Sequence, residues 1–200
     1  MKVVVATRNR GKLVEIARLL GGSPSFELVT IDEIAPEVEL REDEETFQGN
    51  AVAKARQAAI ATGLPAIADD SGLEVDALNG APGVWSARYA GEPSDDARNN
   101  AKLLEALRGV PDEQRKARFR CAAAFVDRAR AIEMVECGEC EGNILEAPRG
   151  TGGFGYDPLF LATGLTQTMA ELPVDKKNQV SHRAAAFRAL AATMKTHSLI

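Results

Sequence analysis

Cysteine and histidine are scarce in this chain of 200 residues, which contains three cysteines and two histidines. Cys137 and Cys140 have C-x-x-C spacing, but a zinc site needs further ligands. The one remaining cysteine, Cys121, and the two histidines are a poor source of them. A thioredoxin-like motif would be followed by a helix, whereas Glu141-Gly142 follows here. We therefore interpret both residues as strand cysteines that stay reduced.

Long apolar runs and dense tracts of lysine or arginine are also absent. No segment approaches the roughly 20 apolar residues of a membrane-spanning helix. Met1 and Lys2 lead directly into a short apolar strand, without the pattern of a signal peptide. The formal net charge of −5 makes the chain a poor candidate for binding the phosphate backbone of nucleic acids. We expect a cytoplasmic protein that binds neither membranes nor nucleic acid.

The pattern of apolar residues predicts an α/β fold. Strand-like and helix-like segments alternate up to Leu78, and residues 118–126, 131–135 and 143–147 indicate further strands. A chain of this length can bury a good core as one domain. We predict a single domain over residues 1–200, with a mixed, twisted central sheet flanked by helices and two lobes with a ligand cleft between them.

Two helix starts are marked by capping residues. Thr46 is predicted to cap a helix that runs to Ala61, and Ser94 is predicted to cap a helix that runs to Leu107. Gly49 at the third position of the first helix weakens it by roughly 0.5–1 kcal/mol relative to alanine.

A polar loop follows the first predicted strand. Residues 7–12 lead from this strand into a segment whose apolar side chains recur with helical spacing from Leu13. In open α/β sheets ligands bind in such loops at the carboxyl ends of strands, and Gly11 allows the backbone to approach a ligand closely. The spacing of a Walker A loop is missing. The loop is therefore either a ligand-binding loop or an ordinary solvated turn.

Two adjacent carboxylates, Asp69 and Asp70, follow a short apolar strand. We expect a glycine turn next to them and a second strand after it. The pair is either part of a ligand site or a purely structural Asp-rich turn, because Asp-Ser-Gly is favourable turn chemistry. Carboxylates suit Mg²⁺, which takes one or two of them together with phosphate oxygens and water. One of the pair could also act as a general base on water. Since strand neighbours point to opposite faces, only one is expected to face a ligand directly.

A glycine-rich aromatic segment covers residues 152–157 and includes Phe154, Gly155, Tyr156 and Asp157. An aromatic pair and an acceptor carboxylate in a loop could hold a flat base. The acidic run of residues 42–45 is typical of a solvated loop, although one member could reach a metal.

A basic segment lies between Lys177 and Arg183. Ser181 is predicted to cap a helix whose first turn contains His182 and Arg183. The helix dipole makes two basic side chains unfavourable there unless an anion lies in front of them. The segment is thus a candidate phosphate site, and the alternative is that both side chains point into water.

Six segments carry a family resemblance when they are taken in chain order. They are Thr7-x-Asn9-x-Gly11-Lys12, Thr46-Phe47-x-x-Asn50-Ala51, Ala68-Asp69-Asp70-Ser71-Gly72-Leu73, Gly80-Ala81-Pro82-Gly83 with Ser86-Ala87-Arg88-Tyr89, Gly152-Gly153-Phe154-Gly155-Tyr156-Asp157-Pro158, and Lys177 with Ser181-His182-Arg183. Each is weak alone. In this order they resemble the inosine triphosphate pyrophosphatase family, also called dITP/XTP pyrophosphatases, over nearly the whole chain.

The resemblance implies a Mg²⁺-dependent homodimer that hydrolyses dITP, ITP and XTP to the monophosphate and pyrophosphate, removing aberrant purines from the nucleotide pool. It implies that Asp70 is the proton acceptor and a metal ligand, and that Glu42 is a second metal ligand. The residues that it implies in substrate binding are Thr7, Arg8, Asn9, Arg10, Gly11, Lys12, Ser71, Phe154, Gly155, Tyr156, Asp157, Lys177, His182 and Arg183.

Two positions depart from the usual pattern of the family. Gly49 stands where a glutamate often precedes Asn50, so any metal role of that glutamate is lost, and Arg8 stands where glycine is frequent. Two other functions stay open: a general nucleotide phosphohydrolase that releases inorganic phosphate, and a non-catalytic nucleotide-binding module. The paired carboxylates Asp69 and Asp70 argue against the second.

Overall fold

A mixed sheet forms the framework of the computed structural model, which describes residues 1–8, 10–20 and 26–200. Its strands are β1 (Lys2–Val5), β2 (Glu27–Thr30), β3 (Ala66–Val75), β4 (Lys116–Asp127), β5 (Ile132–Ile144) and β6 (Phe160–Ala162). Their order is β2-β1-β3-β4-β5-β6. β1 runs parallel to β2 and β3, whereas β5 and β6 are antiparallel, so the prediction of a mixed sheet is confirmed.

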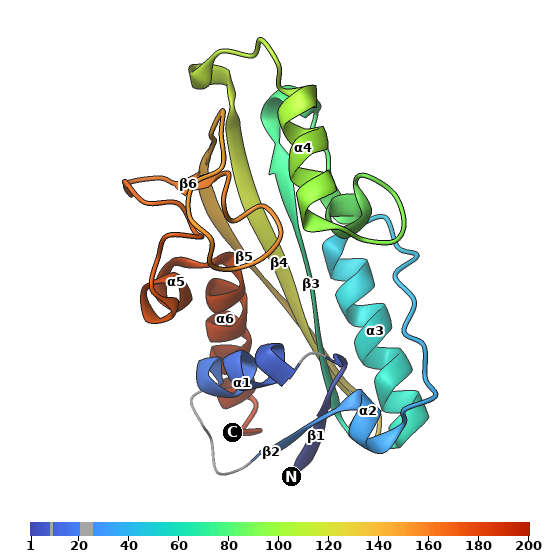
Figure 1. Ribbon diagram of the computed structural model, residues 1–200. Helices are drawn as coiled ribbons and strands as arrows, with labels where there is room; N and C mark the ends of the chain where they lie inside the picture. The colour runs from blue at the N-terminus through green and yellow to red at the C-terminus, as the bar shows by residue number, and fades with distance from the viewer. Residues whose placement is uncertain (9, 21–25) are drawn as a thin grey trace. The chain divides into compact units, whose positions relative to one another are not determined.

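Helices connect and flank these strands (Figure 1). They are α1 (Arg10–Leu19), α2 (Ile31–Ile34), α3 (Phe47–Thr62), α4 (Asp96–Ala106), α5 (Val174–Val180) and α6 (His182–Thr196), with short 3₁₀ turns η1 (Asp76–Leu78), η2 (Gly83–Arg88) and η3 (Asp112–Gln114). In the part of the chain that the structure describes, no helix has the length and apolar character needed to cross a membrane.

The chain divides into two compact units. The first comprises residues 1–70, 121–138 and 183–200, and the second comprises residues 71–120 and 139–182. Both units take residues from β3, β4 and β5. The units correspond to the two predicted lobes, and the predicted ligand cleft stays a prediction.

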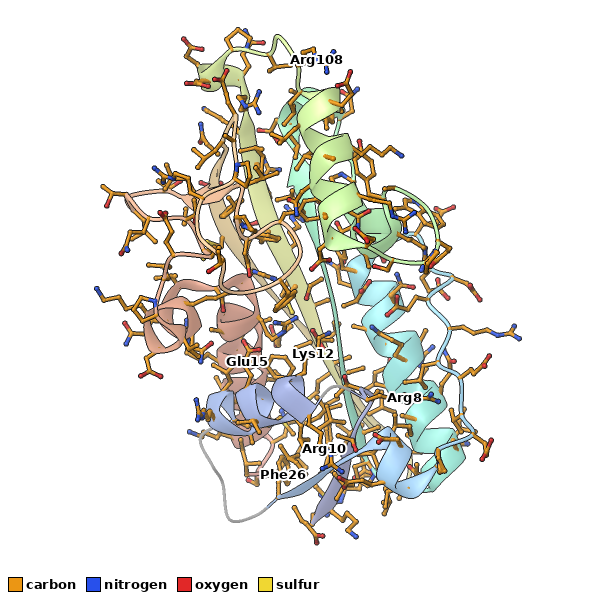
Figure 2. All side chains as sticks on the ribbon, in the orientation of Figure 1. Arg8, Arg10, Lys12, Glu15, Phe26 and Arg108 are labelled. Atoms are coloured by element: carbon orange, nitrogen blue, oxygen red, sulfur yellow. The ribbon has the colours of Figure 1, made fainter. Side chains whose placement is uncertain are left out.

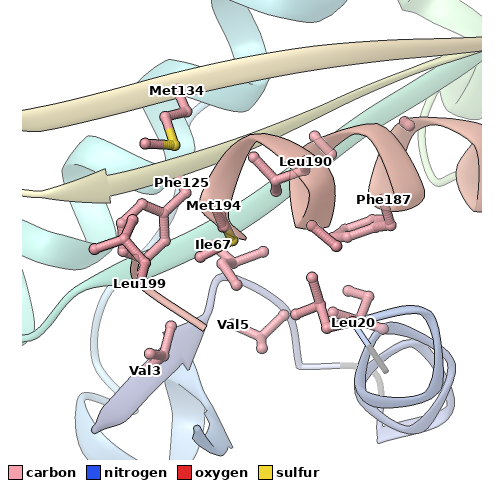
Figure 3. Packing of buried hydrophobic residues seen from close by; sticks show 14 of the residues in the cluster. Val3, Val5, Leu20, Ile67, Phe125, Met134, Phe187, Leu190, Met194 and Leu199 are labelled. Carbon is pink, nitrogen blue, oxygen red and sulfur yellow. The ribbon is translucent and has the colours of Figure 1, made fainter. Parts of the chain in front are cut away.

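The first unit has helices on both faces of its strands. α1 and α6 lie on one face and α3 lies on the other (Figure 1). Strand side chains alternate between the two faces of a sheet. On the face covered by α1 and α6, Val5, Ile67 and Phe125 of the strands form a buried cluster with Ile16 and Phe187 of the helices (Figure 3). This packing holds the starts of α1 and α6 beside the middle of β3.

The second unit has its own core. Leu103 of α4 and Leu107, which directly follows the helix, are fully buried in a cluster with Leu73, Phe160 and Tyr156. α4 is thereby held by its apolar face, while its first turn is left to contact loops of the same unit.

Local signals explain some element boundaries. Thr46 caps α3 as predicted, because its hydroxyl oxygen accepts a 3.0 Å hydrogen bond from the backbone N–H of Gly49. The prediction for Ser94 is wrong by one residue: Asp95 caps α4 by accepting from the N–H of Arg98, and Ser94 donates to a backbone carbonyl instead.

Two further expectations are corrected. α1 begins at Arg10, so the loop predicted over residues 7–12 is shorter than expected, and Lys12 is a cation at a helix start, as the sequence indicated. β3 runs unbroken through Asp69 and Asp70 to Val75, without the predicted turn. β3 lies between β1 and β4 in the sheet, and β1 ends opposite Ala66 and Ile67. Past Asp70 the strand continues as the neighbour of β4 and stays largely buried, which outweighs the local turn preference of Asp-Ser-Gly.

Candidate active site

Charged side chains of the first unit gather around the middle of β3. The group that we call the charged cluster consists of Lys12 and Glu15 of α1 (Figure 2), Glu42, Lys54 of α3, Asp69 and Asp70 of β3, and Arg183 of α6. These residues are far apart in the sequence, and the packing of α1, α3 and α6 on the strands brings them together.

Asp69 is a buried carboxylate that faces two cations. Its Oδ2 atom lies 3.1 Å from Nε of Arg183 and 3.5 Å from Nζ of Lys12. Burial alone would raise the pKa of Asp69, but attraction by Lys12, Arg183 and Lys54 outweighs it and holds this pKa well below its usual value. Asp69 therefore stays ionised and orients both cations.

Arg183 is the buried counterpart of this carboxylate. Its guanidinium donates to Asp69 and, over 3.3 Å, to Glu15 of α1. Burial opposes the charged form, but the two carboxylates raise the pKa of Arg183, so the guanidinium stays charged. The sequence predicted an anion in front of this basic helix start, and protein carboxylates supply negative charge there.

Asp70 has different partners from its neighbour. Its Oδ2 atom accepts a 3.0 Å hydrogen bond from Nδ2 of Asn50, and its Oδ1 atom lies 3.9 Å from Nζ of Lys54. Asn50 is buried, and its Oδ1 atom accepts from the backbone N–H of Glu44. The two aspartates thus meet different elements, α1 and α6 for Asp69 but α3 for Asp70, as expected for neighbours in a strand.

Lys54 joins the acidic loop to β3. It donates to Glu42 over 2.5 Å and to the backbone carbonyl of Asp69 over 2.6 Å. Burial would lower the pKa of Lys54, but Asp70, Glu42 and Asp69 raise it. The sequence reasoning missed Lys54 and gave Asn50 no role. Two polar residues four positions apart on the alanine-rich face of one helix were the available signal.

Glu42 and Asp70 are the candidate metal ligands, and both face the ammonium group of Lys54. Among the described residues no group of three or more His, Cys, Asp or Glu side chains could hold a metal ion. Mg²⁺ bound with a nucleotide needs only one or two carboxylates, since phosphate oxygens and water complete its shell. Glu42 and Asp70 supply two carboxylates that already face the same cation, the ammonium group of Lys54, and so fit that requirement.

In the second unit, the segment 152–157 forms a braced loop that we call the aromatic loop. Asp157 is buried and accepts a 2.9 Å hydrogen bond from the backbone N–H of Phe154, and it also pairs with Lys177. The Lys177 ammonium lies 4.8 Å from the centre of the Phe154 ring, and Phe154 is 56% exposed. Tyr156 is buried instead, and its hydroxyl donates to the carbonyl of Ser86.

The other predicted substrate contacts stay predictions, with their surroundings now known. Arg8 donates to the backbone carbonyls of Pro36 and Val38, and Arg10 lies 3.9 Å from Glu33. His182 is buried and stacks on Phe119, with 4.8 Å between ring centres. The remaining predicted contacts are Thr7 after β1, Gly11 in α1, Ser71 in β3, and Asn9, which lies outside the described residues.

The cysteines lie in strands, as the sequence predicted. Cys121 is buried in β4, and Cys137 and Cys140 lie in β5 without a disulfide between them. Burial raises the pKa of the Cys140 thiol to about 11.

Residues 3–193 match the Ham1 family. A dITP/XTP pyrophosphatase of Geobacter sulfurreducens is 54% identical over 196 residues, which is 98% of this chain and 96% of the relative. A dITP/XTP pyrophosphatase of Desulforamulus reducens is 54% identical over 188 residues, covering 94% of this chain and 92% of the relative.

Solved structures of similar proteins give the same assignment. The Staphylococcus aureus Ham1 protein matches with a TM-score of 0.90 at 38% identity, covering 98% of this chain and all of that chain. A nucleoside-triphosphatase or dITP/XTP pyrophosphatase of Mycobacterium abscessus matches with a TM-score of 0.79 at 46% identity, covering 97% of this chain and 99% of that one. The resemblance predicted from the motifs is thus confirmed: the chain belongs to the Ham1 family.

Proposed function

We propose that this protein hydrolyses the deaminated purine nucleoside triphosphates dITP, ITP and XTP to the monophosphate and pyrophosphate. Relatives that carry the name dITP/XTP pyrophosphatase are 54% identical to it over at least 94% of its length. The proposed biological role is the removal of these aberrant purines from the nucleotide pool.

The observation that carries the proposal is that two adjacent carboxylates have different hydrogen-bond and ion-pair partners. Asp69 is engaged by Arg183 and Lys12, whereas Asp70 is held by the neutral amide of Asn50, with Lys54 farther away. A general base must be able to accept a proton, which a carboxylate in close contact with two cations does poorly. Asp70 is therefore the proposed proton acceptor.

The charge of the cluster supports a requirement for Mg²⁺. Its three cations and four carboxylates give a formal charge of −1, which by itself does not favour a triphosphate. Glu42 and one carboxylate oxygen of Asp70 would hold the ion, which leaves the other oxygen of Asp70 to accept a proton. When bound, it would neutralise charge on the phosphate oxygens.

The chain's own residues would perform the remaining tasks. Asp70 would orient a water molecule toward the α-phosphorus and take up its proton. Lys12 and Arg183, both oriented by Asp69, would attract the phosphate chain. Attack at the α-phosphorus breaks the bond to the bridging oxygen, so pyrophosphate leaves as one unit. No protein nucleophile is required.

The aromatic loop would recognise the base. Phe154 offers an exposed ring for stacking, and the segment has both hydrogen-bond donors and acceptors. A site whose donors meet a 6-oxo group rejects a 6-amino base, because those donors would be left unpaired. ATP is accordingly expected to be a poor substrate.

Product analysis tests the proposal. dITP, XTP, ATP and GTP would each be incubated with the protein and Mg²⁺, and phosphate would be measured with and without added inorganic pyrophosphatase. We expect phosphate from dITP and XTP only when the coupling enzyme is present. Phosphate without it would indicate a general phosphohydrolase, and no reaction at all would indicate a nucleotide-binding module.

The variant Asp70→Asn tests the catalytic role. Loss of a general base typically lowers turnover by about 10²–10⁴-fold, and calorimetry should still detect ITP binding. Glu45→Gln is a matched control, because Glu45 is an exposed acid of the same run. Unchanged turnover in the Asp70 variant would remove Asp70 from the mechanism.

The assembly and location of the protein also remain proposals. We propose a homodimer in the cytoplasm. Light scattering should then give about twice the chain mass of 21.4 kDa, and a mass equal to that of one chain would contradict it.

A further inference from the structure

Side chains at the N-terminal end of α4 contact the backbone of the aromatic loop. The Gly155 N–H donates a 2.6 Å hydrogen bond to Oδ2 of Asp96, and the Gly155 carbonyl accepts a 2.8 Å hydrogen bond from Nδ2 of Asn100. Both polar groups of one peptide residue are therefore held by side chains one helical turn apart. Gly155 has φ = 59°, a left-handed conformation that glycine adopts without a side-chain clash.

The orientation of the Asn100 amide follows from its partners. Its Nδ2 group donates to two carbonyls, those of Gly155 and Asp96. An oxygen at the same position would face two acceptors, so the NH₂ group must be the one that points there. The Asn100 Oδ1 atom is buried and has no hydrogen-bond partner in the described part of the chain. The Asn100 side chain therefore contacts the loop as a hydrogen-bond donor.

The Asp96 contact is charge-assisted. A carboxylate that accepts from a backbone N–H makes a shorter and stronger hydrogen bond than a neutral acceptor does. Asp96 is also the first residue of α4, where the helix dipole favours a negative charge. The carboxylate is therefore suitably placed for the helix as well as for the loop.

The opposite side of the loop is braced by other residues. Asp157 accepts from the Phe154 N–H, and Lys177 lies over the Phe154 ring. The ring itself is largely exposed, so its position depends on how firmly the backbone on both sides is held. Asp157 restrains this backbone from within the loop, and α4 restrains it from outside.

We infer that Asp96 and Asn100 are positioning residues that preorganise the aromatic loop for the purine base. The inference rests on the proposed function, because it assigns Phe154 to base binding. A loop that is already ordered loses less conformational entropy when the ligand binds. The contacts of Asp96 and Asn100 with Gly155, which we call the clamp, should therefore strengthen ground-state and transition-state binding equally. Such a change affects KM and leaves kcat unchanged.

Steady-state kinetics with dITP test this split. In Asp96→Ala we expect KM to rise about tenfold, from the loss of one charge-assisted hydrogen bond, with kcat within about twofold of the wild type. Asp96→Asn keeps an acceptor oxygen and should restore most of the affinity. Glu105→Gln is the matched control, since Glu105 is an exposed residue of α4 that pairs with Arg108.

Variants of Asn100 distinguish a hydrogen-bonding role of its side chain from a role in filling space. Asn100→Asp keeps the shape but places an oxygen against the carbonyls of Gly155 and Asp96. It should therefore raise KM more than Asn100→Ala does. Equal KM values for these two variants, or a fall in kcat without a change in KM in Asp96→Ala, would overturn the inference.

Amide exchange separates the clamp from the proposed function. By nuclear magnetic resonance, the Gly155 N–H should exchange at least about tenfold faster in Asp96→Ala than in the wild type. Core amides of β4 should exchange as before. An unchanged Gly155 rate would refute the clamp even if dITP is hydrolysed. Faster exchange in a protein that does not hydrolyse dITP would support the clamp while the proposed function fails.

Discussion

Asp69→Asn removes the carboxylate charge that pairs with buried Arg183 and half-buried Lys12, and it keeps the shape of the side chain. The asparagine oxygen can still accept from Arg183, but Lys12 and Arg183 lose their common carboxylate. Glu15 remains 3.3 Å from Arg183. The substitution therefore isolates the contribution of one charge to the charged cluster.

The magnitude can be bounded from the contacts. Removing one partner of a buried ion pair typically costs about 3–5 kcal/mol, and a hydrogen bond to a charged group contributes about 1.5–3 kcal/mol. Because the amide keeps an acceptor and Glu15 keeps a charge near Arg183, we expect a loss of about 3 kcal/mol in the free energy of unfolding. Glu15→Gln should cost about 1 kcal/mol, because Asp69 remains.

Urea unfolding followed by circular dichroism at neutral pH measures these losses. The double variant Asp69→Asn with Glu15→Gln removes both carboxylates that pair with Arg183. Its loss should exceed the sum of the single losses by at least about 1 kcal/mol. Asp43→Asn is the control for the same change at an exposed carboxylate.

The pH dependence supplies a second check. The pKa of Asp69 is lowered in the folded protein, whereas it is about 3.9 in an unfolded chain. The stabilisation is therefore complete above the unfolded pKa and is lost as the pH falls through the lower folded pKa. The difference between wild type and Asp69→Asn should stay constant from pH 8 to about pH 5 and shrink in stronger acid. A loss below about 1 kcal/mol at neutral pH, or strict additivity in the double variant, would refute the reasoning.

Three other predictions concern single side chains. Tyr156→Phe leaves a buried backbone carbonyl without its hydroxyl donor and should lower the free energy of unfolding by about 1–2 kcal/mol in urea; no loss would show that this contact is unimportant. Gly49→Ala should destabilise the protein despite the better helix propensity of alanine, because the new Cβ would lie 2.8 Å from Cβ of Glu44; a higher melting temperature would contradict this. Iodoacetamide at pH 8 should modify exposed Cys137 ahead of Cys140, whose thiol has a pKa raised to about 11 by burial; mass spectrometry of peptides would show the order, and equal rates would disprove it.

Local sequence chemistry accounts for several features of the fold. The Thr46 cap, the strand β1 and the start of α6 directly after Ser181 depend on neighbouring residues, and the sequence predicted them. The alternation of strand side chains also predicted that Asp69 and Asp70 would have different surroundings. The order of six short motifs was sufficient to predict the family.

The features that only the tertiary structure decided depend on distant parts of the chain. Arg183 meets Asp69 and Glu15 across 114 and 168 positions, and no local pattern announces which carboxylates will neutralise it. The contact of Asn100 with Gly155 spans 55 positions in the same way. β3 passes straight through a sequence with turn chemistry, because its place beside β4 and its burial in the sheet favour an extended backbone. Residue types and their spacing thus determined the family and the chemistry available, whereas packing between distant elements decided which charges meet and how each is oriented.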